Sequence, residues 1–187
     1  MILRAVLLLL WAAGAGAAEG LSIETVRRDA AVEVHAHALI DASHDTVWST
    51  LTDYDHLGDF IPGMKRSRVV AREGNAAVIE QHGAAHFLFF SFPLDVTIES
   101  TARPPGAIDV RLVKGNLRRL EGGYRVRQLA PGRIELRWNG LVEPDTLPPL
   151  LGEWVMRTNI RDQFTGMVRE IERREAERRR AAVAPRQ

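Results

Sequence analysis

Two histidines, His35 and His37, are the first residues of this sequence whose type and spacing suit metal chemistry. They stand two positions apart in a stretch that alternates apolar and polar residues, so a strand would present both imidazoles on one face, with Glu33 beside them. A structural zinc site needs four ligands, however, and the sequence identifies no complete set. We therefore interpret these histidines as solvent-exposed strand residues and expect no metal site.

Glu153 and Arg157 are a second pair of residues that could take part in chemistry or binding, and they are spaced four residues apart in a predicted helix. This spacing allows an ion pair, and both residues fall inside the apolar stripe of the helix, where polar groups need partners. One hypothesis is that the pair marks the mouth of a cavity and orients the polar head of a ligand. The alternative is an ordinary ion pair on the helix surface. The sequence shows no nucleophile elbow, phosphate loop or paired-carboxylate signature.

The first 18 residues are built like a secretory signal peptide. Arg4 precedes a run of apolar residues, and small residues occupy positions 13–18. The apolar run is shorter than the roughly 20 residues that span a bilayer, which argues against a membrane anchor. We expect cleavage near Ala17 or Ala18 and a periplasmic or secreted mature protein.

The composition excludes several classes of function. The chain has 187 residues and no cysteine, so a disulfide framework and cysteine-based zinc or nucleophile sites are excluded. Without Arg4 the 25 basic residues become 24, equal to the 24 acidic residues. This balance argues against nucleic acid as a partner. Basic residues do gather near the C-terminus, interleaved with glutamates, and we interpret that segment as the solvated end of a helix.

The hydrophobic pattern predicts seven strands and one long helix, and these elements must position the histidine pair and the Glu153 and Arg157 pair. Apolar and polar residues alternate in the strands, and turn signals such as Gly74-Asn75 separate neighbours. The expected strands are residues 31–40, 67–73, 76–84, 86–100, 107–114, 118–129 and 133–143. Pro148 and Pro149 then start a helix with one broad apolar stripe. This order predicts a single domain in which a sequentially paired antiparallel sheet packs against that helix.

Residues 41–64 carry the most informative local signature, because they place two short helices between the first strand and the later ones. Ser43 can cap the first helix by accepting a hydrogen bond from a backbone N–H. Trp48 and Leu51 contribute to the apolar stripe of that helix, and Pro62 ends the segment. The segment therefore predicts the front of a cavity-forming fold.

This pattern resembles the polyketide cyclase/dehydrase and coenzyme Q-binding branch of the START-like (SRPBCC) superfamily. The resemblance implies an α+β helix-grip fold, in which a curved antiparallel sheet of about seven strands surrounds a long C-terminal helix, and two short helices follow the first strand. It divides the chain into a signal peptide at residues 1–18, a START-like ligand-binding domain at residues 30–175, and a charged helix overhang with a tail at residues 176–187. We expect no cofactor.

The resemblance also implies an elongated apolar cavity beneath the long helix that takes hydrophobic ligands. Residues that the pattern turns toward this space are candidates for its lining, and the alternative is that they only pack against one another. The candidates are Phe90, Phe92, Leu112, Tyr124, Trp138, Met156, Arg157, Ile160, Phe164 and Met167.

Three functions are compatible with these expectations. The preferred one is the exported, non-catalytic binding or transport of a hydrophobic small molecule, such as an isoprenoid quinone, a lipid or a polyketide-like compound. The first alternative is an enzyme similar to polyketide cyclases and dehydrases, with Tyr124, His82 or Arg157 transferring protons, although spacing pairs no acid with a base. The second is a module that contacts a membrane or a protein through Phe87, Phe89 and the Arg-rich tail.

Overall fold

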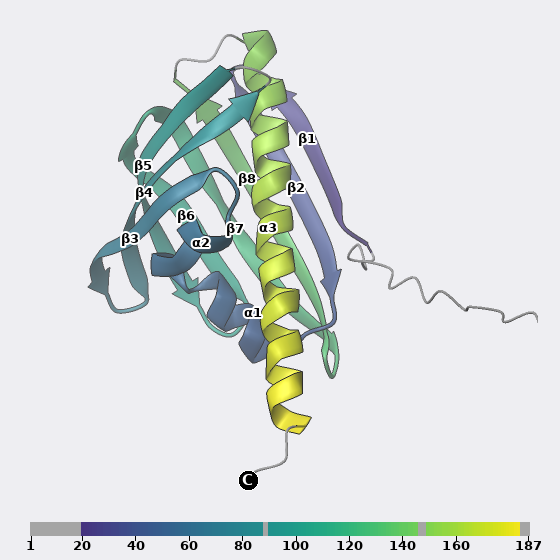
Figure 1. The fold of residues 1–187 in the computed structure, drawn as a ribbon. Helices are drawn as coiled ribbons and strands as arrows, with labels where there is room; N and C mark the ends of the chain where they lie inside the picture. Colours follow the sequence, from purple (N-terminus) through teal and green to yellow (C-terminus); the bar gives the residue numbers. More distant parts are fainter. Residues whose placement is uncertain (1–19, 88–89, 146–148, 184–187) are drawn as a thin grey trace, which may run out of the picture.

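The computed structural model describes residues 20–87, 90–145 and 149–183, which form one antiparallel sheet and a long helix that crosses it (Figure 1). The strands are β1 Ser22–Arg28, β2 Ala31–Ile40, β3 Met64–Glu73, β4 Ala76–Phe87, β5 Phe90–Arg103, β6 Ala107–Gly115, β7 Leu117–Ala130 and β8 Arg133–Pro144. The helices are α1 His44–Leu51, the 3-10 helix η1 Tyr54–His56, α2 Leu57–Phe60 and α3 Pro149–Val183. The predicted α+β helix-grip fold is confirmed.

The strands follow the order β1-β2-β8-β7-β6-β5-β4-β3, and neighbouring strands are antiparallel. Figure 1 shows the sheet curving around α3, with α1 and α2 on the same side of the sheet as α3. The last turns of α3 run past the end of the sheet, and residues 177–183 are exposed there. The curvature leaves a space between the sheet and the first half of α3, which the short helices border at one end.

The sequence pattern does not predict β1, which adds an eighth strand at the edge of the sheet beside β2. Of its apolar residues, Ile23 packs against the core, whereas Val26 is 41% exposed. An edge strand with so little buried surface lacks the sustained alternation that marks a strand in a sequence. The sheet therefore begins ahead of residue 30 and has eight strands instead of about seven.

The predicted strand over residues 86–100 is wrong, because the chain reverses inside it. β4 ends at Phe87, β5 begins at Phe90, and these two residues pair in the antiparallel register. The alternation of apolar residues continues through the reversal without the Gly or Asn that usually marks a tight turn, so the sequence conceals it. Leu88 and Phe89 lie outside the described residues, as does the side chain of Phe87. The membrane contact expected of Phe87 and Phe89 stays a prediction.

Strand β2 shows how the alternating pattern builds the core. Val34, Ala38 and Ile40 are fully buried, whereas His35 between them is exposed. Fully burying a side chain the size of valine or isoleucine stabilises the fold by about 1.5–3 kcal/mol. The inner face of the sheet therefore holds α3 and the short helices against it mainly through apolar contact.

The C-terminal part of α3 is fixed to α1 by a buried carboxylate. Glu175 is 2% exposed, and it accepts hydrogen bonds from the Thr46 hydroxyl at 2.7 Å and from the backbone N–H of Ser43 at 3.2 Å. Ser43 in turn caps α1, since its hydroxyl accepts a hydrogen bond from the N–H of Thr46. A carboxylate is stabilised at a helix N-terminus because unpaired N–H groups gather there. This contact helps to set how α3 lies over the sheet.

Candidate ligand-binding cavity

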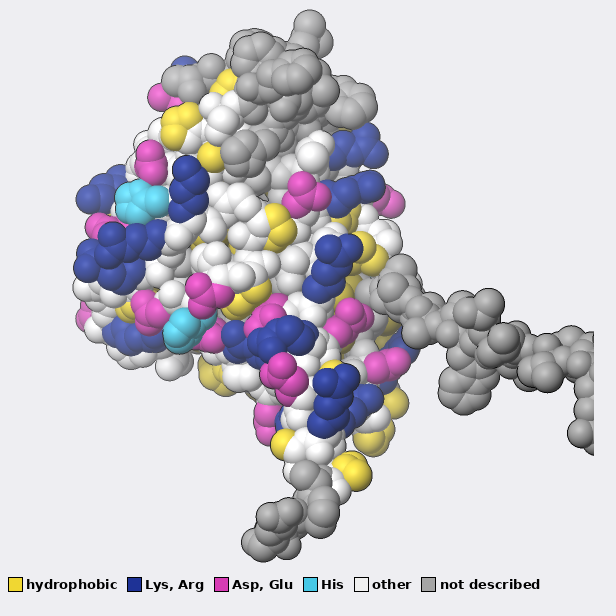
Figure 2. All heavy atoms as spheres, viewed as in Figure 1, with side chains coloured by type: hydrophobic (Ala, Val, Ile, Leu, Met, Phe, Trp, Pro, Cys, Tyr) yellow, Lys and Arg dark blue, Asp and Glu magenta, His cyan; other side chains and the backbone are white. Residues whose placement is uncertain are grey.

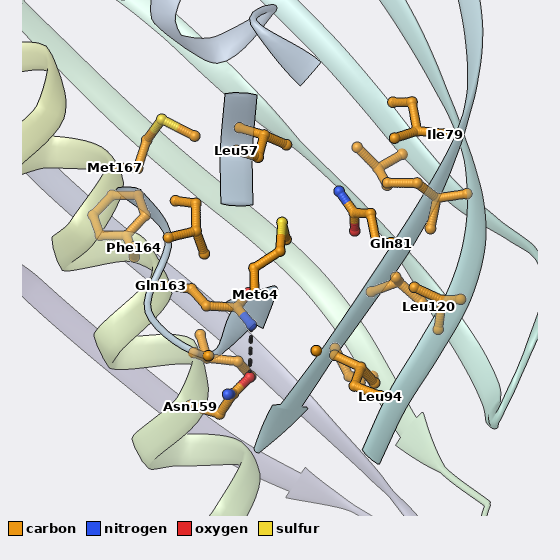
Figure 3. Close-up of a pocket in the computed structure, with 18 of the residues that line it drawn as sticks. Leu57, Met64, Ile79, Gln81, Leu94, Leu120, Asn159, Gln163, Phe164 and Met167 are labelled. Atoms are coloured by element: carbon orange, nitrogen blue, oxygen red, sulfur yellow. Dashed lines mark hydrogen bonds between the residues drawn. The ribbon is translucent and has the colours of Figure 1, made fainter. Parts of the chain in front are cut away.

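A cavity of about 190 Å³ lies between the N-terminal half of α3 and the inner face of the sheet (Figure 3). Strands β3 to β8 form one side of its wall, α3 forms the other, and α1, η1 and α2 contribute at one end. The apolar wall residues include Leu57, Ile79, Leu94, Val96, Ile98, Ile108, Leu120, Trp138, Met156, Ile160, Phe164 and Met167. An apolar space surrounded by core elements, with a few polar groups, is the usual form of a small-molecule site.

The loop between α2 and β3 borders the cavity because it fits closely between α3 and β4. The carbonyl oxygen of Gly63 accepts a hydrogen bond from the backbone N–H of Ala84 at 2.8 Å. A Cβ atom on Gly83 would collide with that oxygen, and a Cβ atom on Gly166 would collide with the ring of Pro62. Gly63 itself has a φ of +80°, a conformation that favours glycine. These glycines allow the loop to lie against both elements.

Helix α3 turns one face toward the cavity through residues spaced three or four apart. Ile160, Phe164 and Met167 lie on this face, as 3.6 residues per turn requires. Two polar residues, Asn159 and Gln163, share it. The side-chain N–H of Gln163 donates to the Asn159 carbonyl oxygen at 2.8 Å (Figure 3). The side-chain NH₂ group of Asn159 and the side-chain amide oxygen of Gln163 have no hydrogen-bond partner among the described residues.

Two tyrosines reach the cavity, and their hydroxyls differ. The buried hydroxyls of Tyr54 and Ser100 form a hydrogen bond of 2.9 Å. The ring of Tyr124 packs against Trp138 with 4.8 Å between centroids, but its hydroxyl has no hydrogen-bond partner among the described residues. Burial raises the pKa of both tyrosines, and that of Tyr124 reaches about 12. At neutral pH each is therefore an uncharged phenol, and only Tyr124 has its hydroxyl available to a ligand.

Gln81 is an isolated polar group on the sheet side of the wall. It lies on β4 between Ile79 and Gly83, and Figure 3 shows its amide projecting from the strand into the cavity. Among the described residues the amide has no hydrogen-bond partner. Directly opposite in the β3–β4 register, the buried hydroxyl of Ser67 also lacks a partner in the described structure. The sheet thus places unmatched polar groups at this point of an otherwise apolar interior.

The described part of the wall contains no Asp, Glu, Lys or Arg, and its one histidine points away from the cavity. His82 borders the space through its backbone, because side chains alternate along β4 and its neighbours Gln81 and Gly83 face inward. Its Nδ1 lies 2.8 Å from Oδ1 of Asp95 on β5, and both side chains are at least half exposed. His82, a proton-transfer candidate in the sequence, is therefore not placed to reach a ligand in the cavity.

Six of the predicted lining residues border the cavity, and they come from both the sheet and the helix. They are Tyr124, Trp138, Met156, Ile160, Phe164 and Met167. Leu112 packs against the core cluster outside the wall, and Phe92 is half-buried outside it. Arg157 is exposed on α3 and also lies outside the wall, whereas the side chains of Phe90 and Glu153 are not described. Ligand binding by any of these residues stays a prediction.

The amide side chains of the wall were not among the residues predicted from the sequence. Gln81 was detectable, because it falls on the same face as Ile79 in a predicted strand, and a lone polar residue at an inward position is a signal. Asn159 and Gln163 were detectable in the same way from their four-residue spacing within an apolar stripe. The contact between η1 and β5 that pairs Tyr54 with a serine had no such signal.

The histidines of β2 lie apart from the cavity, on the outer face of the sheet. His35 Nδ1 is 2.8 Å from Oδ1 of Asn139, and His37 Nε2 is 3.2 Å from Oε1 of Glu135. Within the described ranges, no three His, Cys, Asp or Glu residues are grouped to hold a metal ion. These imidazoles are partners in surface hydrogen bonds.

A family model described as polyketide cyclase / dehydrase and lipid transport matches residues 40–176. The chain belongs to this family. The match runs from the end of β2 through most of α3, so it includes the two short helices and nearly all of the elements that form the cavity wall. Among curated proteins, none matches this member of the polyketide cyclase/dehydrase and lipid transport family significantly.

Solved structures share the fold of this family member at low sequence identity. The Zhui aromatase/cyclase from a Streptomyces species is 15% identical, with a TM-score of 0.70 over 83% of this chain and 99% of that chain. A STAR-related lipid transfer protein fragment from Xanthomonas axonopodis is 15% identical, with a TM-score of 0.67 over 84% and 96%. A START superfamily protein from Mycobacterium smegmatis is 15% identical, with a TM-score of 0.59 over 78% and 97%. At these identities the likeness shows the fold alone.

Proposed function

We propose that this protein binds a hydrophobic small molecule in the cavity under α3 and carries it without changing it. The observation that carries the proposal is the apolar cavity itself, which lies inside the core between the sheet and the helix. The family description, which includes lipid transport, supports it, as does the presence of a lipid transfer protein among structures of the same fold. An isoprenoid quinone, a lipid or a polyketide-like compound is the ligand class that we propose.

The size of the cavity gives a physical reason to expect an occupant. Unfilled space in a core costs stability, because the side chains around it lose contact with neighbours. The cavity beneath α3 is partly open to solvent, so in the ligand-free protein water can reach its apolar wall, and that contact is unfavourable. A bound apolar molecule restores the contacts that the wall side chains lack, so the fold gains stability when the ligand is present.

A cyclase-like enzyme is the second candidate, and Tyr124 is the observation in its favour. Its hydroxyl borders the cavity without a protein partner. A general acid or base works best with a pKa near the operating pH, and burial raises the pKa of Tyr124 to about 12. Arg157 is exposed, and His82 is paired with Asp95 on the outer face. Tyr124 therefore suits hydrogen bonding to a ligand better than proton transfer.

Membrane contact through the Arg-rich end of α3 has less support, because much of its charge is compensated. Arg173 pairs with Glu170, and both Arg178 and Arg179 pair with Glu175. Among the described residues, no helix is both long enough and apolar enough to cross a membrane. We favour a structural role for this end of the helix.

Export to the periplasm is also part of the proposal, and it rests on the sequence alone. Residues 1–18, which carry the predicted signal peptide, lie outside the described residues. Edman sequencing of protein recovered from a periplasmic extract should give an N-terminus at residue 18 or 19, as cleavage after Ala17 or Ala18 requires. An N-terminus at Met1 would contradict export by cleavage.

Binding can be tested with the neutral fluorescent probe N-phenyl-1-naphthylamine and a variant that narrows the cavity. Ile160 borders the cavity, and the larger ring in Ile160→Trp would occupy part of that space. We expect the wild-type protein to bind one probe molecule and Ile160→Trp to bind at least about tenfold more weakly, a loss of about 1.4 kcal/mol. Fluorescence titration measures both affinities.

The matched control is Arg161→Trp, which adds the same ring to an exposed neighbour on α3. It should bind the probe like the wild-type protein, provided circular dichroism shows that all three proteins are folded. Equal binding by Ile160→Trp and Arg161→Trp would place the probe elsewhere. No probe binding by the wild-type protein, together with no hydrophobic molecule in native mass spectra of the purified protein, would contradict the carrier proposal.

A further inference from the structure

The cavity wall carries hydrogen-bonding groups on two facing sides, and each side has unmatched atoms. On the sheet side these are the amide of Gln81 and the hydroxyl of Tyr124. On the α3 side they are the side-chain NH₂ group of Asn159 and the side-chain amide oxygen of Gln163. Figure 3 shows Gln81 reaching into the cavity from the sheet, with Asn159 and Gln163 across from it on the helix. A ligand between them would meet polar groups from both sides.

The side chains of these four wall residues are half-buried, so water can reach their unmatched groups in the ligand-free protein. A ligand that displaces this water must supply hydrogen-bond partners in its place, because a buried donor or acceptor without a partner costs about 1–3 kcal/mol. The hydroxyl of Ser67, opposite Gln81 in the register and itself buried, adds a further unmatched group beside the cavity. By contrast, the nearby Tyr54 and Ser100 hydroxyls satisfy each other at 2.9 Å. Packing alone would favour leucine or methionine at position 81, so the amide is suited to a ligand that offers it a hydrogen-bond partner.

The groups in the wall also limit the charge of the ligand. The polar side chains that face the cavity in the described part of the wall are amides and hydroxyls, and this part contains no Asp, Glu, Lys or Arg side chain. A buried carboxylate or ammonium without an opposite charge is strongly disfavoured, because it loses its hydration. A neutral ketone or hydroxyl needs only one or two hydrogen bonds, which amide and phenol groups supply.

We propose that the cavity selects an uncharged, largely apolar molecule that carries ketone or hydroxyl oxygen atoms within its body, held by Gln81 and Tyr124 from the sheet and by Asn159 and Gln163 from α3. This inference rests on the proposed function and deepens it. It excludes free fatty acids and other ligands whose ionised group would have to enter the cavity. Tyr124 donates and Gln81 can donate or accept, so a ketone oxygen is a suitable partner for either side chain.

Three probes of one shape separate polarity from size: 2-acetylnaphthalene has a neutral ketone, 2-ethylnaphthalene has no oxygen, and 2-naphthoate has a carboxylate. We expect the ketone to bind the wild-type protein about tenfold more tightly than the hydrocarbon, since a hydrogen bond contributes about 0.5–1.5 kcal/mol. Naphthoate at pH 7.5 should bind more weakly than the ketone by at least tenfold. Isothermal titration calorimetry measures all three affinities.

The variants Gln81→Leu and Tyr124→Phe assign the preference to the wall. At least one of them should bring the ketone-to-hydrocarbon ratio close to 1, while the hydrocarbon binds each variant at least as tightly as it binds the wild-type protein. The matched control is Gln128→Leu, which makes the same change at an exposed position of β7 and should keep the full ratio. Retained affinity for the hydrocarbon shows that a variant is still folded around its cavity.

The possible failures are distinguishable. If the hydrocarbon and the ketone bind equally, or if naphthoate binds as tightly as the ketone, the selection is refuted while hydrophobic binding stands. If the ketone preference survives in both cavity variants, these side chains do not cause it, and the inference is likewise overturned. If none of the three probes binds, the proposed function fails and the inference falls with it.

Discussion

The two halves of α3 differ in how completely their polar side chains are hydrogen-bonded. Residues 156–167, the cavity-facing half, present apolar side chains and incompletely bonded amides to the cavity. Residues 170–179, the anchoring half, present buried carboxylates whose partners are all in place. In our proposal a ligand completes the hydrogen bonding of the cavity-facing half, whereas the carboxylates of the anchoring half are paired within the chain.

Two buried glutamates organise the anchoring half. Glu175 receives hydrogen bonds from Ser43, Thr46, Arg178 and Arg179. These partners come from the start of α1 and from the next turn of α3, so the carboxylate joins two helices. Arginine and N-terminal N–H groups are also the partners that stabilise a buried carboxylate best.

Glu170 forms the second anchor, one turn before Glu175. It accepts from Arg173 and Arg174, each at 2.7 Å. Arg174 extends this contact to Asp53 at 2.9 Å and lies 5.3 Å from the centre of the Phe60 ring. Figure 2 shows acidic and basic side chains gathered along the lower part of the molecule, where this half of α3 meets the short helices. The helix can therefore keep its position while its other half borders an open space.

The largest expected effect is the loss of the anchor in Glu175→Gln. The variant keeps the shape of the side chain but removes the charge that accepts from two arginines and from the start of α1. We expect the free energy of unfolding to fall by about 3 kcal/mol, because hydrogen bonds to charged groups contribute about 1.5–3 kcal/mol each. Urea unfolding measures the difference.

Glu177→Gln is the matched control for this prediction. Glu177 lies on the same helix and pairs with Arg173, but its side chain is 58% exposed. An exposed pair contributes about 0.2–1 kcal/mol, so this variant should be close to the wild-type protein. Equal losses in the two variants would mean that burial at Glu175 adds nothing, and the contrast between the halves of α3 would be wrong.

A smaller effect is expected in the acid range. The hydrogen bonds from Arg173 and Arg174 lower the pKa of Glu170 below its ordinary value of 4.5. The stability that comes from a lowered pKa is present above pH 4.5 and is lost as the pH falls through the folded-state value. Glu170→Gln should therefore reduce the slope of unfolding free energy against pH below 4.5, measured by urea unfolding at several pH values.

A residue of the cavity-facing half provides the control for the slope of unfolding free energy against pH. Gln163→Leu changes an uncharged residue on the same helix, so it should keep the slope of the wild-type protein. Part of the slope should also survive in Glu170→Gln, because Arg127 and Arg137 hold the pKa of Glu135 at about 2. If the slope of unfolding free energy against pH were the same in Glu170→Gln as in the wild-type protein, the Glu170 carboxylate would not be an anchor in solution.

The same contrast explains what the sequence could predict. Trp138 and Phe164 fall at inward positions because strand and helix periods place a side chain relative to its own element. A period does not tell which residues of distant elements meet. The Glu175 and Thr46 contact joins positions 129 residues apart, and the Tyr54 and Ser100 contact joins positions 46 residues apart. The apolar wall was therefore largely predictable, whereas the anchors were not.

The hydrophobic pattern also does not predict whether an apolar stripe forms a filled core or borders a cavity. The cavity beneath α3 depends on how close the helix lies to the sheet, which Gly83 and Gly166 influence by admitting the loop at Gly63. These close approaches are properties of three elements together. The resemblance to a helix-grip fold implied a cavity, whereas the pattern alone favoured packing of each candidate residue in a filled core.

The smallest expected effect tests whether the cavity-facing side is truly incomplete without a ligand. In ligand-free protein, Gln81→Leu should raise the free energy of unfolding by about 1 kcal/mol, since it removes an unmatched amide from an apolar space. Ser100→Ala should instead lower it by about 1–2 kcal/mol, because it leaves the buried hydroxyl of Tyr54 without its partner. Urea unfolding after lipid extraction compares them. A loss in Gln81→Leu as large as that in Ser100→Ala would mean that the amide already has a partner, and that both sides of the molecule are equally complete before any ligand binds.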